Sequence, residues 1–378
     1  MLAPTLLAAS LGLLASPVHA GSRLWEANSP LGGLSTNGTM DIERRAISFQ
    51  PTGGESGHYT WPDKKIKYCY ADATAKQKLR GPLAEAMQTT WGALVDLGFK
   101  YEEVDLAKCD KDPINHLKIY YNDQGKLATS IGKQPVDEKW NRENPDNQIL
   151  GPTMHLSTME GIGMLDLVAN VAHELGHAWG LYHEHQNPNF WVTSVDDQFP
   201  PDGGPIWASY NGDVPVFKPS QFNCQALSDY VDALSRALTL ASQAPEYADI
   251  ALTFCSNQAH ASKVKFSGKD WLPLSHGVPV IADAQFDPDS IMLYPSGAGG
   301  VRSGNTPDGR DDVLTLAEGV RMKPNVVPSA MDVERLRVLY SVNIANIQEL
   351  HIRGAKKSMF DKVKKKMTKF GSAKDKKC

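Results

Sequence analysis

The sequence lacks long hydrophobic runs. Among its 378 residues, the one clear apolar stretch is Leu6 to Ala15, which is too short to span a bilayer as a helix. Pro17 and the small-residue ending Val18-His19-Ala20 follow it, which is typical of a signal peptide, although no Lys or Arg precedes the stretch. We therefore expect residues 1–20 to be a signal peptide and the mature protein to be secreted and extracellular.

Cysteine is also scarce, with five residues in the whole chain. This usage fits an oxidising, extracellular compartment, and an odd count leaves one thiol over. Four cysteines can pair in three ways, of which the simplest joins neighbours. We expect Cys69 to pair with Cys109 and Cys224 with Cys255, leaving Cys378 free or bonded to another chain.

Neither sign of charge dominates, because 39 Lys and Arg face 43 Asp and Glu, for a net charge of −4. Many of the cations lie in residues 351–378, which hold eleven Lys and Arg against two Asp. Apolar residues recur there at steps of three and four, which predicts a short basic amphipathic helix. They are Phe360, Val363, Met367 and Phe370. Such a tail, taken as residues 346–378, could contact an anionic surface, or it could be solvated without a partner. No nucleic-acid motif accompanies the charge, so we expect no nucleic-acid partner.

Residues 173–184 read His-Glu-Leu-Gly-His-Ala-Trp-Gly-Leu-Tyr-His-Glu. His173 and His177 are four apart and lie on one face of a helix. His183 cannot reach them from the same straight helix, so the chain must turn, and Gly180 permits this because it accepts positive φ. Three imidazoles with an open fourth position are the ligand set of a catalytic zinc ion. None of the cysteines is placed to join them.

Glu174 follows the first histidine and can point at the open metal position. A carboxylate there takes a proton from zinc-activated water as the water attacks a carbonyl carbon, and later gives it to the departing amine. The pattern predicts a Zn²⁺-dependent endopeptidase with Glu174 as the general base and a protein or peptide as the substrate. A purely structural zinc site needs no base and fills its fourth position.

The pattern H-E-x-x-H-x-x-G-x-x-H is the zinc site of the metzincins. Glu184 after the third histidine resembles the astacins, and the segment through Pro188 resembles an astacin sequence with Asn187 in place of the usual Arg. The resemblance implies that Glu184 pairs with the freed amino terminus of the mature enzyme. Taken alone, Glu184 would be a solvated charge. His185 reads as a surface neighbour of the site rather than a ligand.

Residues 287–295, reading Asp-Pro-Asp-Ser-Ile-Met-Leu-Tyr-Pro, resemble the Met-turn of astacins, with Leu293 where a His is usual. The resemblance implies that Met292 forms an apolar floor beneath the zinc. It also implies that Tyr294 is an extra zinc ligand at rest or a hydrogen-bond donor to the oxyanion. Weaker matches at Trp61 and Ile66–Tyr68, and again in 313–340, extend the resemblance in patches over most of residues 61–340.

Residues 21–45 are expected to be a pro-segment or flexible lead. Cleavage after Arg44-Arg45 would start the enzyme at Ala46, as mature astacins begin, and would make Ala46 the partner of Glu184. The family's aspartate motif is not evident in this lead, where Asp41 is a loose candidate. The one glycosylation sequon begins at Asn37.

The apolar patterns predict strands at 66–70 and 117–121 and helices at 77–97, 165–179 and 227–244. Residues 153–157 are expected to form the edge strand that pairs with substrate. His183 and Met292 are 109 positions apart, longer than an astacin leads us to expect. We interpret residues of about 190–285 as an insertion that shapes substrate choice.

The resemblance implies an α+β metzincin fold over residues 46–345. A twisted mixed sheet with two helices should form an upper subdomain, and an irregular lower subdomain should carry the Met-turn. Two alternatives remain. One is a metzincin of another branch, against which Glu184 and Tyr294 argue. The other is a non-enzymatic, zinc-containing secreted binding protein that acts through its basic tail, against which Glu174 argues.

Overall fold

The computed structural model describes residues 25–28, 47–49, 60–134, 136, 138–143, 148, 150–191, 216–274, 280–281 and 285–341. Several predictions fall outside these residues and stay predictions. They concern the signal peptide (1–20), Asn37, Asp41, Arg44-Arg45, Ala46, the basic tail (346–378) and Cys378. In the described part, no helix combines the length and apolarity that a bilayer crossing requires.

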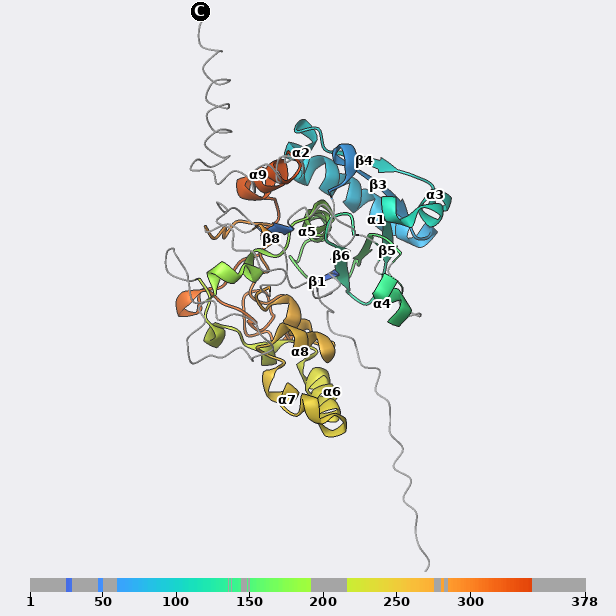
Figure 1. Ribbon diagram of the computed structural model, residues 1–378. Helices are drawn as coiled ribbons and strands as arrows, with labels where there is room; N and C mark the ends of the chain where they lie inside the picture. Colours follow the sequence, from blue (N-terminus) through green and yellow to red (C-terminus); the bar gives the residue numbers. More distant parts are fainter. Residues whose placement is uncertain are drawn as a thin grey trace, which may run out of the picture.

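A mixed six-stranded sheet organises one half of the molecule (Figure 1). Its strands, in spatial order, are β1 (Trp25–Asn28), β6 (Leu127–Ser130), β7 (Thr153–Leu156), β5 (Leu117–Tyr121), β3 (Lys65–Tyr70) and β4 (Lys100–Glu103). Neighbouring strands are parallel except β6 and β7. The strands predicted at 66–70 and 117–121 are confirmed. The prediction that residues 153–157 form the edge is wrong, because β6 pairs with β7 on its outer side.

Two helices cover one face of this sheet. Helix α1 (Ala73–Glu85) contacts β3 and β5, α5 (Leu167–Trp179) contacts β6 and β7, and the two helices contact each other. The helix predicted at 77–97 begins earlier, because the Asp72 side chain caps it by accepting from the Ala75 amide at 2.7 Å. It is also broken into α1, a π-helical turn η2 (Ala86–Thr90) and α2 (Gly92–Asp96).

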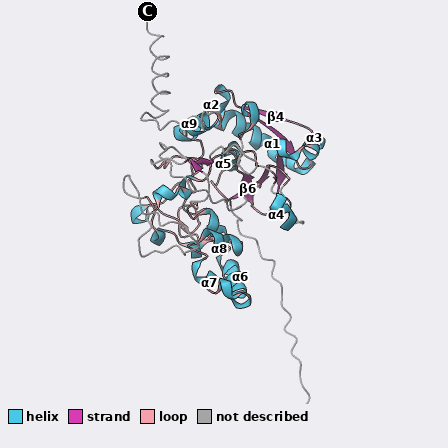
Figure 2. Ribbon diagram, viewed as in Figure 1, coloured by secondary structure: helices cyan, strands magenta, loops and turns pink. Residues whose placement is uncertain are grey.

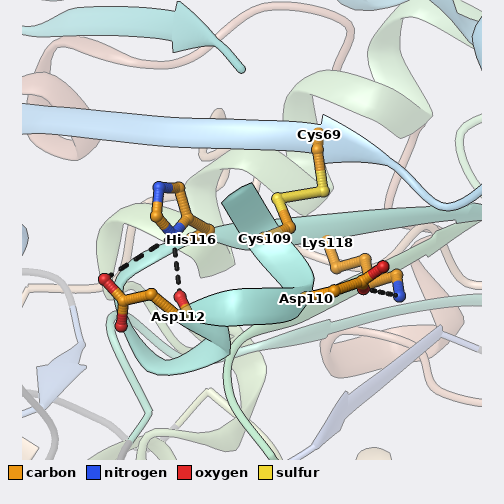
Figure 3. The surroundings of a disulfide bond; sticks show 6 residues. All are labelled: Cys69, Cys109, Asp110, Asp112, His116 and Lys118. Carbon is orange, nitrogen blue, oxygen red and sulfur yellow. Dashed lines mark hydrogen bonds and ion pairs between the residues drawn. A yellow bond between two sulfur atoms is a disulfide. The ribbon is translucent and has the colours of Figure 1, made fainter. Parts of the chain in front are cut away.

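The disulfide Cys69–Cys109 joins β3 to α3 (Leu106–Lys111) (Figure 3). Nearby, the Lys118 ammonium pairs with the Asp110 carboxylate at 2.7 Å. A second disulfide joins Cys224 to Cys255 in the other half of the molecule. Both bonds confirm the pairing of neighbours expected from the sequence.

The second half, which includes the described part of the segment predicted to be an insertion, has little regular structure (Figure 2). Three helices, α6 (Tyr230–Gln243), α7 (Ile250–Thr253) and α8 (Gln258–Lys263), lie together at the opposite end of the molecule from α2 and α9 (Figure 1). Helix α6 confirms the helix predicted at 227–244, with a later start. Two further helices are α4 (Glu138–Glu143) and α9 (Ala330–Leu339), which is the last helix in the described residues. Strand β2 (Ser48–Phe49) pairs with β8 (Val280–Ile281) in a separate two-stranded sheet.

Short 3₁₀ turns connect these elements. They are η1 (Pro62–Lys64), η3 (Pro113–Asn115), η4 (Glu184–Gln186), η5 (Pro188–Phe190), η6 (Pro219–Gln221), η7 (Cys224–Ala226), η8 (Pro245–Tyr247), η9 (Ser267–Asp270) and η10 (Ala317–Gly319). The observed architecture is a mixed sheet with helices on one face, followed by an irregular half that carries Met292. The α+β fold class predicted from the sequence is confirmed.

Candidate metal centre

Helix α5 carries the first two histidines through the centre of the protein. It begins after Asp166, whose side chain accepts from the Ala169 amide at 2.8 Å, and every residue from 169 to 179 is buried. Ionisable side chains on a helix that is buried on every side carry a large desolvation cost unless they are paired or bind a metal. His173, Glu174 and His177 are such side chains.

The turn after α5 returns the chain to the same site. Gly180 follows the helix with φ of +116°, where a side chain would be strained. A Cβ at Gly180 would also lie 2.4 Å from a ring carbon of Phe49. The turn brings His183 to within 2.9 Å of His177, measured between the two Nε2 atoms. The corresponding distance from His177 to His173 is 3.1 Å. The predicted convergence of the three imidazoles is therefore present.

Each imidazole is oriented by a hydrogen bond from its other nitrogen. The Nδ1 of His173 lies 2.7 Å from the Ile291 carbonyl, and that of His177 lies 2.8 Å from the Leu181 carbonyl. The Nδ1 of His183 lies 2.8 Å from the Gln186 side-chain oxygen. These oxygens can only accept, so Nδ1 carries the proton in each neutral ring. Three Nε2 lone pairs therefore face one another.

This arrangement fits a bound cation. Facing lone pairs repel unless a cation or proton lies among them, and the ligand atoms all lie within 4.8 Å of one another. Burial lowers the pKa of His177 to about 4. Burial, with the charge of neighbouring histidines, also lowers the pKa of His173 and of His183 well below the usual value. The rings are thus neutral near pH 7, and neutral imidazole nitrogen is a preferred zinc ligand.

Glu174 supplies a buried carboxylate beside the three rings. Neither of its oxygens has a hydrogen-bond partner among the described residues. Burial raises the pKa of Glu174 to about 8. The nearby Thr129 hydroxyl partly offsets this rise in pKa, and the negative charge of Asp270 adds to the rise. A carboxyl group with a raised pKa is well matched to accept and return a proton near neutral pH.

Met292 packs against α5 between the two helix histidines. A Cβ placed on Gly176 would lie 2.4 Å from the Met292 sulfur, so only glycine leaves room for that side chain. The Met292 carbonyl accepts from the Glu184 amide at 3.0 Å. The adjacent Ile291 carbonyl is the acceptor for His173. The turn thus holds both the helix and the segment that follows the third histidine.

The Tyr294 ring lies beside the histidines and is 2% exposed. Its centroid is 4.2 Å from that of His183, 4.7 Å from that of His185 and 5.8 Å from that of His173. The ring therefore lies next to two of the three histidines that are predicted to hold the metal. Whether its hydroxyl binds metal or an oxyanion stays a prediction.

Glu184 and His185 are both buried rather than solvated. Glu184 is 1% exposed, and its carboxylate accepts from the Asp287 amide at 3.0 Å. His185 is fully buried and its Nε2 donates to the Asp270 carbonyl at 2.9 Å, so its interpretation as a surface neighbour is wrong. Ala46 lies outside the described residues, but the next residue, Ile47, accepts from the Tyr182 amide at 3.0 Å. The pairing of Ala46 with Glu184 stays a prediction.

The sequence did not reveal three side chains that support the site. Gln186 accepts from His183, and its amide nitrogen donates to the Leu272 carbonyl at 3.2 Å. Asp332 accepts from the Ile291 amide at 2.9 Å, and Asp270 lies near Glu174. Of these, Asp332 alone had a sequence signal, because Ser329 and Asp332 have the spacing of a helix capping box.

The chain resembles astacin-like metzincins in its zinc-site motif and in the convergence of its three histidines. No protein-family model matches the sequence, and no curated protein does. Among solved structures, myroilysin is 14% identical over 75% of this chain and 97% of that chain, with a TM-score of 0.35. High choriolytic enzyme 1, a hatching-enzyme zinc-protease from the medaka Oryzias latipes, is 13% identical over 78% and 100%, with a TM-score of 0.39. Structural similarity at this level of identity and TM-score gives no information about the chemistry of this chain. The chemistry is argued from the residues of the site.

Proposed function

We propose that this protein is a secreted, zinc-dependent endopeptidase of the astacin-like type. His173, His177 and His183 hold Zn²⁺, and Glu174 is the general base. One observation carries the proposal: three Nε2 lone pairs converge in a buried site beside a carboxylate that has no hydrogen-bond partner among the described residues. A structural zinc site would need no such carboxylate.

Bound Zn²⁺ would polarise the substrate carbonyl and lower the pKa of water. Glu174 then accepts the proton of the attacking water and donates it to the departing amine. Its burial excludes bulk solvent from the proton that it holds. Tyr294, whose ring packs against that of His183, donates a hydrogen bond from its hydroxyl to the oxyanion as charge develops.

The Tyr294 proposal separates the astacin-like type from another branch of metzincins. Tyr294→Phe keeps the ring packing and removes the hydroxyl. We expect kcat to fall by about 10²-fold, the usual effect of losing one oxyanion donor, with zinc content unchanged. Steady-state kinetics together with metal analysis of the purified variant measure both. An unchanged kcat would favour the other branch.

We further propose that residues 21–45 are a pro-segment. Within it, β1 pairs with the outer edge of β6, with Ala27 opposite Thr129, the residue that lies near Glu174. A polypeptide in this position covers the strand edge to which an extended substrate could add. Cleavage after Arg44-Arg45 would release it and free Ala46 to pair with Glu184.

The tail at 351–378 stays a proposed contact for an anionic surface.

Casein hydrolysis tests the proposed function directly. The secreted, processed protein should hydrolyse casein, lose this activity in a chelator and regain it when Zn²⁺ is added back. Atomic absorption should find about one zinc per chain in the active form. A zinc-loaded, processed protein that leaves casein and gelatin intact would instead support a binding protein that acts through its tail.

A further inference from the structure

The insertion brings a carboxylate to the proposed peptidase site. Asp270 ends the turn η9, and its side chain is 5% exposed. Its main-chain carbonyl accepts from His185, whose ring centroid lies 4.7 Å from that of Tyr294. The next residue, Trp271, stacks edge-on against Tyr294 at 5.0 Å between ring centroids. Asp270 therefore lies next to groups assigned to the chemistry, although it comes from a segment outside the zinc motif and the Met-turn.

The turn that carries Asp270 is held from several sides. The Asp270 carbonyl accepts from His185 at 2.9 Å, and the Lys269 carbonyl accepts from Gln258 at 3.1 Å. At the start of η9, the Ser267 amide and hydroxyl both donate to the Asp229 carboxylate, at 3.0 and 2.5 Å. The main chain at Asp270 is thus fixed before any substrate binds, which lowers the entropy cost of using this residue.

An extended polypeptide already lies against this turn. Strand β1 pairs with β6 along one edge and also contacts η9. A substrate that adds to the β6 edge would follow the same course between the sheet and η9. It would therefore pass Asp270 close to the bond that Glu174 helps to cleave.

We propose that Asp270 is a specificity-determining residue that selects substrates with a cationic side chain, Lys or Arg, beside the scissile bond. This inference rests on the proposed peptidase function and adds the substrate class. A carboxylate on a rigid turn in a buried region forms charge-assisted hydrogen bonds with a guanidinium or ammonium group. It also repels an acidic side chain, which would add a like charge near both Asp270 and Glu174.

Matched peptides test this assignment with the processed, zinc-loaded enzyme. One series carries Arg at each position around the cleaved bond in turn, and the second carries citrulline, which has the same shape without the charge. We expect kcat/KM to favour Arg over citrulline by about tenfold at one position, the effect of one charge-assisted contact. In Asp270→Asn, this ratio should fall below about threefold.

Asp249→Asn is the matched control, because Asp249 is an exposed carboxylate on the same insertion. It should keep the wild-type ratio. Asp270→Asn should retain its zinc. Because Asp270 also lies near Glu174, the rates on both peptides can change in this variant. The ratio of the two rates, rather than either rate alone, therefore separates lost selectivity from lost structure. Should Asp270→Asn fail to fold, the charge-preserving Asp270→Glu should keep a preference for Arg.

Equal cleavage of the Arg and citrulline peptides by wild type at every position would overturn the assignment without any variant. An Arg preference that persists in Asp270→Asn would overturn it too. Both results leave the peptidase function standing. A wild-type enzyme that holds zinc and cleaves no peptide of either series would overturn the peptidase function and the substrate class together.

Discussion

Glu174 is the residue on which the proposed chemistry depends most directly. Glu174→Gln keeps the shape of the side chain but removes its ability to accept a proton. We expect zinc to be retained and kcat to fall by about 10²–10⁴-fold, the usual contribution of a general base. Casein hydrolysis and metal analysis on the same sample measure the two effects. Glu160→Gln, at an exposed position, is the control and should behave as wild type. Full activity of Glu174→Gln would remove Glu174 from the mechanism.

Two glycines on helices make a second matched pair. A Cβ on Gly176 would lie 2.4 Å from the Met292 sulfur, whereas a Cβ on Gly81 in α1 meets nothing within 4 Å. We expect Gly176→Ala to lower the free energy of unfolding by about 1–3 kcal/mol through overpacking. Gly81→Ala should raise it by about 0.5–1 kcal/mol through helix propensity. Urea unfolding followed by circular dichroism measures both.

The source of the Gly176 effect can be tested with a second substitution. Met292→Ala removes the sulfur that the new methyl group would meet. The double variant should therefore lose less stability than the two single losses added together. Strict additivity would show that Gly176 is not needed for the approach of Met292.

Whether a residue of the site could be predicted from the sequence depends on how far along the chain its partners lie. His173, His177 and Gly180 were predictable because helix geometry and positive φ at a helix end follow from local spacing. Gln186 and Asp270 were not, because their roles depend on η9 reaching back across more than eighty positions to the segment after His183. No local pattern encodes a contact of that range.

At the scale of elements, α9 supports the Met-turn through one carboxylate. Asp332 accepts from the Ser290 hydroxyl at 2.7 Å and from the Ile291 and Ser329 amides at 2.9 Å. Ile291 in turn accepts from His173. Asp332→Asn replaces an acceptor oxygen with a donor and leaves one of these groups unsatisfied. We expect a loss of about 1–3 kcal/mol in the free energy of unfolding and weaker zinc retention.

The pH dependence of the Asp332 effect has a defined sign. Burial raises the pKa of Asp332 from 3.8 to about 6, so the folded protein holds this proton more tightly than the unfolded chain. The contribution of Asp332 to stability is therefore greatest below about pH 4 and falls as pH rises to about 6, by on the order of 3 kcal/mol. Asp332→Asn should lose this slope. Unfolding of both metal-free proteins between pH 4 and 7 measures the difference, and equal slopes would contradict it.

The observed boundaries of helices and strands agree with the predicted ones where local residue patterns determine them. They differ where contacts with distant elements determine them. The strands β3 and β5 and the helices α5 and α6 lie where the apolar patterns predicted them. The helix predicted at 77–97 is broken at Trp91, whose indole donates to the Ala172 carbonyl of α5 at 2.8 Å. The edge strand was misplaced because residues 127–130, Leu-Ala-Thr-Ser, show no alternation of apolar and polar residues that would predict a strand. In the structure all four are buried.

At the scale of the whole molecule, the pairing of β1 with β6 joins the lead segment to the proposed peptidase site. Glu26 and Ala27 lie opposite Ala128 and Thr129. Replacing both Glu26 and Ala27 with Pro removes their amide protons, at least one of which faces the β6 edge in a parallel ladder. Losing one such bond costs about 1 kcal/mol, so the uncovered population should grow roughly fivefold.

We expect the unprocessed double-Pro variant, with Arg44 and Arg45 changed to Gln to prevent cleavage, to hydrolyse a short peptide about fivefold faster than the same protein with a native β1. After deletion of residues 21–45, both proteins are identical, so the deleted form gives the upper limit of activity. The comparison isolates strand pairing from processing, because neither unprocessed protein can be cleaved at 44–45. If the double-Pro variant stays as slow as its parent while the deleted form is fast, the lead restrains the enzyme by a route other than the β6 edge.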